Sequence, residues 1–238
     1  MNPFPYKELK QVLKFPFLLI AICWIIFLVN FIFDLNFYQF GISPRKLSGL
    51  IGVLVAPILH VELNHLLSNT IPLFILTTML FYFYKSIAWP VFLWIYFISD
   101  VWLWIGGRNN DITPHYHFGA SILIYGLFTF IFLSGILRKH QPLMVVSAIV
   151  VFLYGSLTWG VLPSNDSVSW EGHLFASICG LLIAYYYKSE GPQKKEYQWE
   201  EYEDNDLEDL QTNIEILSKK IDQIDNLKLT YFDSKVIS

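Results

Sequence analysis

Long apolar runs separated by short polar segments make up most of residues 1–187. A helix needs about 20 mostly apolar residues to cross the hydrocarbon core of a bilayer. Six runs approach or reach that length, and they cover residues 15–33, 65–84, 87–105, 118–137, 142–162 and 172–187. We therefore predict an all-α fold, a polytopic membrane protein whose residues 1–187 form a bundle of six transmembrane helices.

The basic residues near the ends of these runs predict the orientation. Six spans put both termini on the same side of the membrane. If the N-terminus is inside, the inner segments carry nine Lys or Arg and the outer loops only three. The inner set is Lys7, Lys10, Lys14, Lys85, Arg138, Lys139, Lys188, Lys194 and Lys195, and the outer set is Arg45, Lys46 and Arg108. This inner excess of positive charge predicts an N-in/C-in topology.

The segment between the first two runs, residues 34–64, is too long for a simple connection. It contains a short apolar stretch at 47–59, interrupted by Gly49, Gly52 and Pro57. Because this stretch is too short to cross a bilayer, we expect an interfacial or partly buried helix there. We also expect Arg45 and Arg108 to organise the outer loops, against Glu62 or Glu171.

Composition separates this chain from soluble proteins. Apolar residues make up 54% of the chain and charged residues 15%, and the mean hydropathy is +0.44. Soluble domains carry about 25% charged residues, so this composition argues against a soluble globular enzyme and excludes a disordered chain. The net charge of −4 argues against binding to nucleic acid, which normally requires a basic patch.

The charge is unevenly distributed between two parts of the chain. Residues 1–187 have a net charge of +2, whereas residues 188–238 have a net charge of −6. We expect an acidic linker at 188–206, a short cytosolic helix of amphipathic or coiled-coil character at 207–229, and a tail at 230–238. The helix is predicted from apolar residues spaced alternately three and four apart, at Leu207, Leu210, Ile214, Leu217, Ile221 and Ile224. This pattern permits weak self-association.

Polar residues cluster where the second, fourth and sixth spans begin. In the predicted topology all three spans begin on the outer side, so His65 and Asn69, Ser121, and His173 reach a similar depth. His65 and Asn69 lie four residues apart and share one helix face. A zinc site would need a third ligand, and no nearby Asp or Cys completes a plausible set with His60. Hydrogen bonds that join helices are the simplest reading of this pair.

Small residues lie near both Ser121 and His173 in the sequence, and they allow the two helices to pack closely. Ser121 follows Gly119 and Ala120, a segment suited to close helix packing and to a position near a helix N-terminus. His173 shares a helix face with small residues at 176 and 180. If these two faces meet, Ser121 comes within hydrogen-bond reach of His173, the arrangement of a nucleophile and its general base.

These motifs together resemble the rhomboid family of intramembrane serine proteases. The resemblance covers most of residues 41–181 and rests on four motifs in the family's order. They are Gly41 to Arg45 with Gly49, Gly52 and Pro57; His60, His65 and Asn69 in a His-x4-His-x3-Asn pattern; Trp104, Gly107 and Arg108 leading to His117, Gly119 and Ser121; and His173 with Gly180.

The resemblance implies specific roles for the site residues. Ser121 corresponds to the nucleophile and His173 to the base, with no third acidic member. His65 and Asn69 correspond to the oxyanion-hole side chains, aided by the Ser121 amide. Three supporting residues complete the set, namely Tyr125, which stacks on the base, His60, which orients the first loop, and Gly119. No metal or other cofactor is implied.

The resemblance also implies a function and a location. We expect cleavage of peptide bonds in or near transmembrane segments of membrane-protein substrates, in a bacterial inner membrane, with the site opening to the outer side. Two residues depart from the family pattern, because Ile122 and Ala176 stand where glycine is usual. The alternative is therefore a catalytically impaired rhomboid-like protein that binds and escorts membrane segments.

Overall fold

The computed structural model describes residues 6–109, 115–163, 169–193 and 199–236. The chain divides into two compact units, Met1–Lys194 and Lys195–Ser238. The described residues are helical throughout, apart from turns, loops and one isolated bridge between Ile42 and His117. The all-α prediction is therefore confirmed for the described part of the chain.

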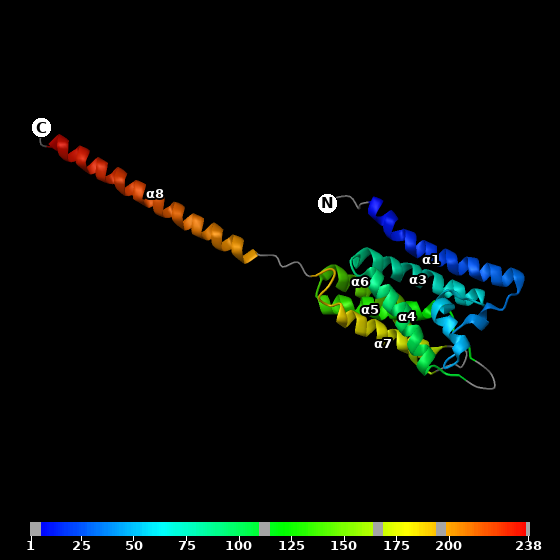
Figure 1. Cartoon of the computed structure of the whole chain (residues 1–238). Helices are drawn as coiled ribbons and strands as arrows, with labels where there is room; N and C mark the ends of the chain where they lie inside the picture. The colour runs from blue at the N-terminus through cyan, green and yellow to red at the C-terminus, as the bar shows by residue number, and fades with distance from the viewer. Residues whose placement is uncertain (1–5, 110–114, 164–168, 194–198, 237–238) are drawn as a thin grey trace. The chain divides into compact units, whose positions relative to one another are not determined.

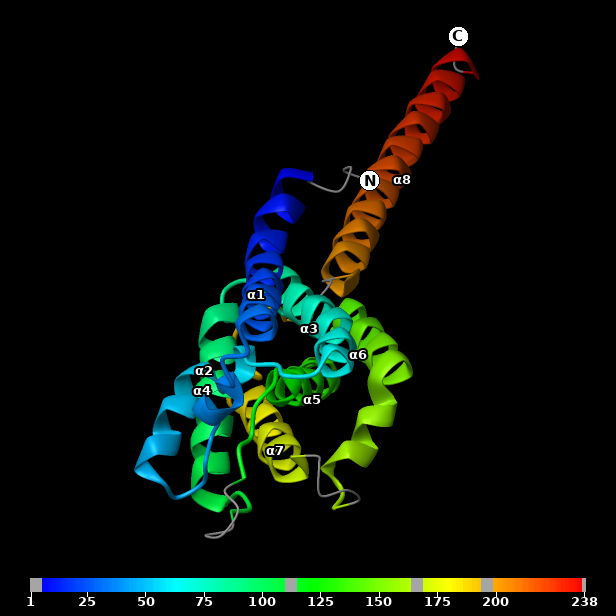
Figure 2. The ribbon, with the colours of Figure 1, turned by 90° about the vertical axis from the view of Figure 1, so that its right-hand side faces the viewer.

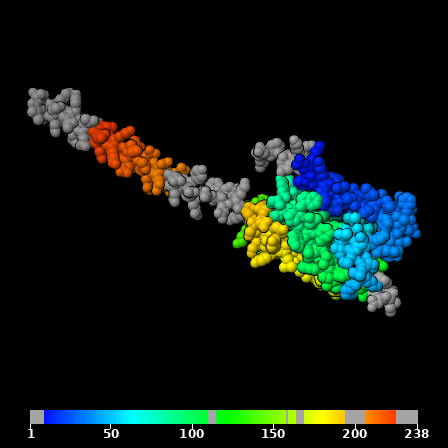
Figure 3. All heavy atoms as spheres, viewed as in Figure 1, coloured from blue at the N-terminus to red at the C-terminus, as the bar shows by residue number. Residues whose placement is uncertain are grey.

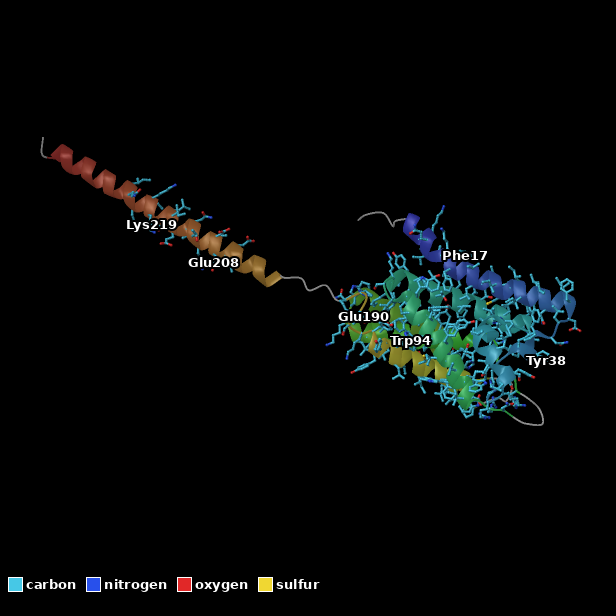
Figure 4. The ribbon with its side chains drawn as sticks, viewed as in Figure 1. Phe17, Tyr38, Trp94, Glu190, Glu208 and Lys219 are labelled. Atoms are coloured by element: carbon cyan, nitrogen blue, oxygen red, sulfur yellow. The ribbon has the colours of Figure 1, made fainter. Side chains whose placement is uncertain are left out.

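Six longer helices make up the first unit (Figure 1). They are α1 (Tyr6–Phe33), α3 (Leu63–Phe83), α4 (Ala88–Gly106), α5 (Ser121–Arg138), α6 (Gln141–Tyr154) and α7 (Trp170–Tyr186). Four of them, α1, α3, α4 and α5, contain a stretch long and apolar enough to cross a membrane. Many of their large apolar side chains are exposed, including Phe17 at 60% and Trp94 at 51%, both labelled in Figure 4. Such side chains suit contact with lipid rather than water.

The other two helices are shorter than the usual length of a helix that crosses a membrane, and only α6 is also shorter than its predicted run. α6 has 14 residues and continues as the 3-10 helix η4 (Gly155–Val161), and together they cover the predicted run at 142–162. α7 has 17 residues. The count of six spans and the N-in/C-in orientation therefore stay predictions.

α5 forms the centre of the first unit. Figure 2 shows α5 enclosed by α3, α4, α6 and α7. Of its membrane-length window, 72% is buried, against 22–39% for α1, α3 and α4. A helix that is apolar on all sides and surrounded by other helices is a core element. Its two ends are consequently fixed by packing on every side.

Glycine permits the closest helix contact in the unit, between α5 and α7. A side chain at Gly180 on α7 would collide with the Gly126 carbonyl and the Thr129 hydroxyl on α5. Thr129 Oγ1 also lies 3.0 Å from the carbonyl oxygen of Ser177 on α7. Small residues let two membrane helices approach until backbone and hydroxyl groups touch. The small-residue face predicted around residues 176 and 180 therefore does meet α5.

The segment between α1 and α3, here called the first loop, contains the short apolar helix expected from the sequence. It consists of η1 (Phe37–Phe40), η2 (Leu47–Ile51), α2 (Gly52–Val55) and η3 (Ala56–Ile58). Gly52 packs so closely on the Ile42 backbone that any side chain would collide with it. The surfaces of α1 (blue) and the first loop (light blue) adjoin on the face shown in Figure 3.

The C-terminal unit consists of one helix, α8 (Trp199–Val236). It is longer than the predicted helix at 207–229, and its first residues lie in the segment expected to be an acidic linker at 188–206. Acidic residues are favourable in the first turns of a helix because they face its positive dipole end. Most of the predicted tail at 230–238 is also helical, and residues 237–238 lie outside the described residues.

Arg138 joins the ends of α5 and α7 that lie opposite Ser121 and His173. It is the last residue of α5 and is 4% exposed. Its guanidinium donates to the carbonyl oxygens of Tyr187 (2.5 Å), Lys188 (3.2 Å) and Glu190, just after α7. The last carbonyls of a helix have no partner within the helix, and a guanidinium supplies five donors. Arg138 thus caps α7 and fixes its position along α5.

Replacement of Arg138 should destabilise the first unit strongly. We expect Arg138→Gln to lower its stability by about 3 kcal/mol, because the carbonyls after α7 lose a charged donor and Arg138 is itself buried. The matched control is Lys139→Gln, which removes the same charge from the neighbouring exposed residue and should have little effect. Thermal unfolding of the full chain in detergent micelles measures both, and equal losses for the two variants would contradict this role of Arg138.

Candidate active site

Ser121 and His173 are in direct contact. Ser121 is the first residue of α5, and His173 lies in the first turn of α7. Ser121 Oγ is 2.9 Å from His173 Nε2, and His173 Nδ1 is 2.9 Å from the carbonyl oxygen of Gly160. A carbonyl oxygen only accepts hydrogen bonds, so Nδ1 carries the ring proton. Nε2 therefore accepts the hydrogen bond from the Ser121 hydroxyl, as a general base must.

Tyr125 holds the ring of His173 in place. The two rings are stacked, with centroids 4.0 Å apart and planes 7° from parallel. On its other side the Tyr125 hydroxyl lies against Gly160, where any side chain would collide with it. The imidazole thus has two fixed contacts, a flat ring against its face and a carbonyl oxygen at Nδ1. Together they orient Nε2 toward Ser121.

His60 and Asn69 connect α3 to the backbone just before Ser121. Asn69 Nδ2 lies 3.1 Å from His60 Nε2, and the Ala120 N–H donates to the same nitrogen at 3.4 Å. An amide nitrogen carries two hydrogens, so Asn69 keeps one donor beyond this bond. Desolvation lowers the pKa of His60 to about 4, and the nearby His65 adds to this effect. His60 is therefore a neutral acceptor at neutral pH.

His65 lies against Gly119. The Gly119 N–H donates to the carbonyl oxygen of Ala56 (2.9 Å), which ties the approach to α5 onto the first loop. Gly119 has φ +111°, a conformation that favours glycine. A side chain there would also collide with the His65 ring. Glycine at this position thus lets His65 lie close to the start of α5.

One cavity connects the candidate side chains. It has a volume of about 640 Å³, and Ser121, His173, His65, Asn69 and Tyr125 all line it. His60 and Gly119, the remaining predicted residues, lie behind this lining. The structure therefore brings all seven predicted residues together at the N-terminal ends of α3, α5 and α7.

His117 ties the segment before α5 to the start of α7. Its Nε2 donates to the carbonyl oxygen of Arg108 (3.1 Å), and its Nδ1 accepts from the Ser169 hydroxyl (2.6 Å). Its backbone also pairs with Ile42 in the first loop. Burial lowers the pKa of His117, so the neutral ring that makes both contacts is favoured.

The arginines of the outer loops have distinct partners. Arg108 Nε lies 2.6 Å from Glu171 Oε1, which confirms one of the two expected carboxylate partners. Arg45 instead donates to the carbonyl oxygens of Ile105 (3.3 Å) and Gly107 (2.8 Å). Arg108 therefore reaches the start of α7, while Arg45 holds the first loop against the end of α4.

Sequence reasoning missed three residues that support this site. The Gly160 carbonyl oxygen accepts the hydrogen bond from His173 Nδ1, the Ser169 hydroxyl binds His117, and Arg138 caps α7. The only sequence feature that marks Gly160 is that it is a glycine within the apolar run at 142–162, which is weak evidence for a role in the site. Backbone carbonyls and loop hydroxyls leave no pattern in a single sequence, so the other contacts had to be seen in three dimensions.

Comparison with known proteins supports the assignment of the fold. The family model described as the Rhomboid domain matches residues 46–190. Uncharacterized proteins of Mycobacterium bovis and Mycobacterium tuberculosis are each 36% identical over 150 residues, which cover 61% of this chain and 62% of theirs. A Mycobacterium leprae protein is 35% identical over the same length, 59% of its own chain. The match thus spans about three fifths of these curated relatives.

Acid should destabilise the first unit partly through His60. The unfolded chain protonates this histidine near pH 6.5, whereas the folded protein does so only near pH 4. Stability therefore falls as the pH drops from about 7 toward 4, since the unfolded state binds the extra proton. We expect His60→Gln to reduce the slope of the unfolding midpoint against pH between 7.5 and 5.

His140→Gln is the control for this measurement, because His140 lies in the turn between α5 and α6, away from the site. It should leave the slope at the wild-type value. An unchanged slope in His60→Gln would show that His60 is not held neutral by burial.

Proposed function

Because this chain belongs to the rhomboid family, we propose that it is an intramembrane serine endopeptidase that cleaves peptide bonds in or near transmembrane segments of other membrane proteins. The observation that carries the proposal is the 2.9 Å contact between Ser121 Oγ and His173 Nε2. The two residues come from different helices and line one cavity, where a substrate carbonyl can reach them.

Ser121 and His173 have the groups needed for acyl transfer. Ser121 Oγ attacks the substrate carbonyl carbon while His173 Nε2 takes the hydroxyl proton. His173 then donates that proton to the leaving amine, and a water molecule hydrolyses the acyl-enzyme with His173 again as base. The Gly160 carbonyl, 2.9 Å from Nδ1, keeps the ring in the required tautomer where other serine proteases use an acid.

The oxyanion that forms in this reaction is assigned three donors. The Ser121 N–H stands at the N-terminus of α5, where the helix dipole favours negative charge. His65 and Asn69 contribute side-chain donors from α3, and both line the cavity. Donors that are fixed before the reaction lower its barrier because they do not need to reorganise.

The membrane context supports a hydrolase that works at the outer side. The dyad lies at the N-terminal ends of α5 and α7, which the predicted N-in/C-in topology puts near the outer surface of a bacterial inner membrane. Water then reaches the acyl-enzyme without crossing the hydrocarbon core. A substrate helix has its carbonyls hydrogen-bonded internally, so it must unwind locally before Ser121 can attack.

The rival proposal is a rhomboid-like protein that binds membrane segments without cleaving them. It draws on Ile122 and Ala176, which replace the family's usual glycines beside the dyad. Both side chains are buried and pack with Tyr125 and Leu103 in one small cluster. The extra bulk is thus accommodated while Ser121 and His173 stay in contact, which favours the protease.

A cleavage assay in liposomes tests the proposal. Incubation of the full chain with a panel of single-span membrane substrates should give fragments cut in or near the span. We expect Ser121→Ala and His173→Ala to reduce the rate by more than about 1,000-fold, because nucleophile and base act as one unit. Ser177→Ala, a neighbouring serine on α7, is the matched control and should cleave normally. Substrate binding without cleavage by the wild type would favour the rival.

A methyl group at Gly119 should impair the oxyanion site through His65. We expect Gly119→Ala to slow cleavage about 100-fold, the usual effect of losing one oxyanion donor. Gly155→Ala is the control, because an added Cβ there meets only ordinary contact, 3.7 Å from Val151. If the effect acts through His65, the double variant Gly119→Ala/His65→Ala should be little slower than His65→Ala alone. Fully additive losses would contradict this route.

A further inference from the structure

α8 carries a continuous apolar stripe that nothing in its own unit covers. Six large side chains along it are each 52–60% exposed. We call this stripe the α8 seam, and it comprises Leu207, Leu210, Ile214, Leu217, Ile221 and Ile224. Their spacing alternates between three and four residues, the a and d positions of a heptad repeat. One isolated helix cannot bury such a stripe, so burial of the seam requires a second surface that packs against it.

We propose that the α8 seams of two copies of this chain pair as a short parallel coiled coil and make the protein a dimer. The heptad repeat itself specifies the partner, because a/d side chains pack into the holes of a second helix with the same repeat. Ile214 at a and Leu217 at d, with Ile221 at the next a, form the combination that favours two strands. This inference is independent of the proposed protease activity.

The charges beside the seam favour a second copy. The e and g positions that flank the seam are occupied by Asp206, Gln211, Asn213, Ser218, Lys220 and Asp225. Three of these are charged, and in a parallel pair the position of Lys220 in one copy faces that of Asp225 in the other, an attractive combination of charges. Two seams can therefore approach without strong repulsion. Glu215 and Lys219 occupy positions away from the contact and pair within the helix at 3.0 Å. Glu208 and Lys219 are labelled in Figure 4.

A lipid surface is a poor alternative partner for the seam. Residues 188–238 have a net charge of −6, and the cytoplasmic leaflet of a bacterial membrane is itself negative. Amphipathic helices that lie on membranes normally carry Lys and Arg on the polar face. The acidic composition of this segment therefore opposes binding to anionic lipid.

Anchoring in the membrane compensates for the short length of the seam. The seam spans about three heptads, roughly 27 Å of helix, which is marginal for a free peptide pair. Here each α8 follows a membrane unit, so two copies are confined to the same bilayer and their tails emerge on the same face. Confinement raises the effective concentration, and a shared face of emergence favours the parallel arrangement.

Cysteine cross-linking of the full chain in liposomes tests the register of the pair. The native Cys23 and Cys179 are buried, and the wild type sets the background. We expect Leu217→Cys, at a d position, to give a disulfide-linked dimer on mild oxidation. Lys219→Cys, two residues away and outside the seam, should give at least about tenfold less. Equal cross-linking at both positions would overturn the proposal.

Self-association measured by fluorescence energy transfer between labelled copies provides the second test. Leu217→Asp should abolish the transfer, because it buries two carboxylates in the contact. Ile216→Asp is the matched control, since Ile216 is a neighbouring exposed apolar residue outside the seam and should leave the transfer unchanged. Equal loss in both variants, or no transfer in the wild type, overturns the proposal. The proposal is also overturned if α8 binds to phosphatidylglycerol vesicles and Leu217→Asp abolishes that binding.

Discussion

The close contact between α5 and α7 is the constraint on which the rest of the site depends. Gly126 and Gly180 let the two backbones approach until a carbonyl of one helix meets the other, and Thr129 adds a polar contact across the interface. Only at this separation do the first turns of the two helices bring a serine hydroxyl within 2.9 Å of an imidazole nitrogen. A side chain at Gly180 would collide with the Gly126 carbonyl, push the two helices apart and break that contact.

Polar contacts at both ends of this helix pair fix its position along the helix axes. At one end Arg138 binds the carbonyls that follow α7, and at the other His117 and Ser169 join the approach to α5 with the start of α7. A helix pair held only by smooth apolar packing can slide, whereas polar groups in hydrocarbon have few alternative partners. These contacts therefore set the height of His173 relative to Ser121.

Topology explains why much of the site was predictable from the sequence. In the predicted topology the second, fourth and sixth spans begin on one side, so the sequence predicts a similar depth for His65, Ser121 and His173. The resemblance to the rhomboid family, drawn from separate short motifs, is confirmed by the family match over residues 46–190. Hydrophobic length alone was less informative for α6, where the 3-10 helix η4 replaces the second part of the predicted run at 142–162.

The remaining parts were hidden because they use backbone groups. The Gly160 carbonyl orients His173, and carbonyls after α7 bind Arg138, yet every residue has a carbonyl and none marks its role in the sequence. α8 is also longer than the predicted helix at 207–229, because the charged and polar residues that indicate a linker before it are compatible with a helix as well. Such features follow from three-dimensional packing and leave little trace in residue order.

The reactivity of Ser121 is the most direct test of the account. Ser68 and Ser169 also line the cavity, so a fluorophosphonate probe that enters it can meet three serines, including Ser121. If His173 activates its partner, mass spectrometry of the full chain labelled in liposomes will find one adduct, on Ser121, and the adduct will disappear in His173→Ala. No adduct on the wild-type protein, or an adduct on Ser68 or Ser169 that persists without His173, would contradict the account.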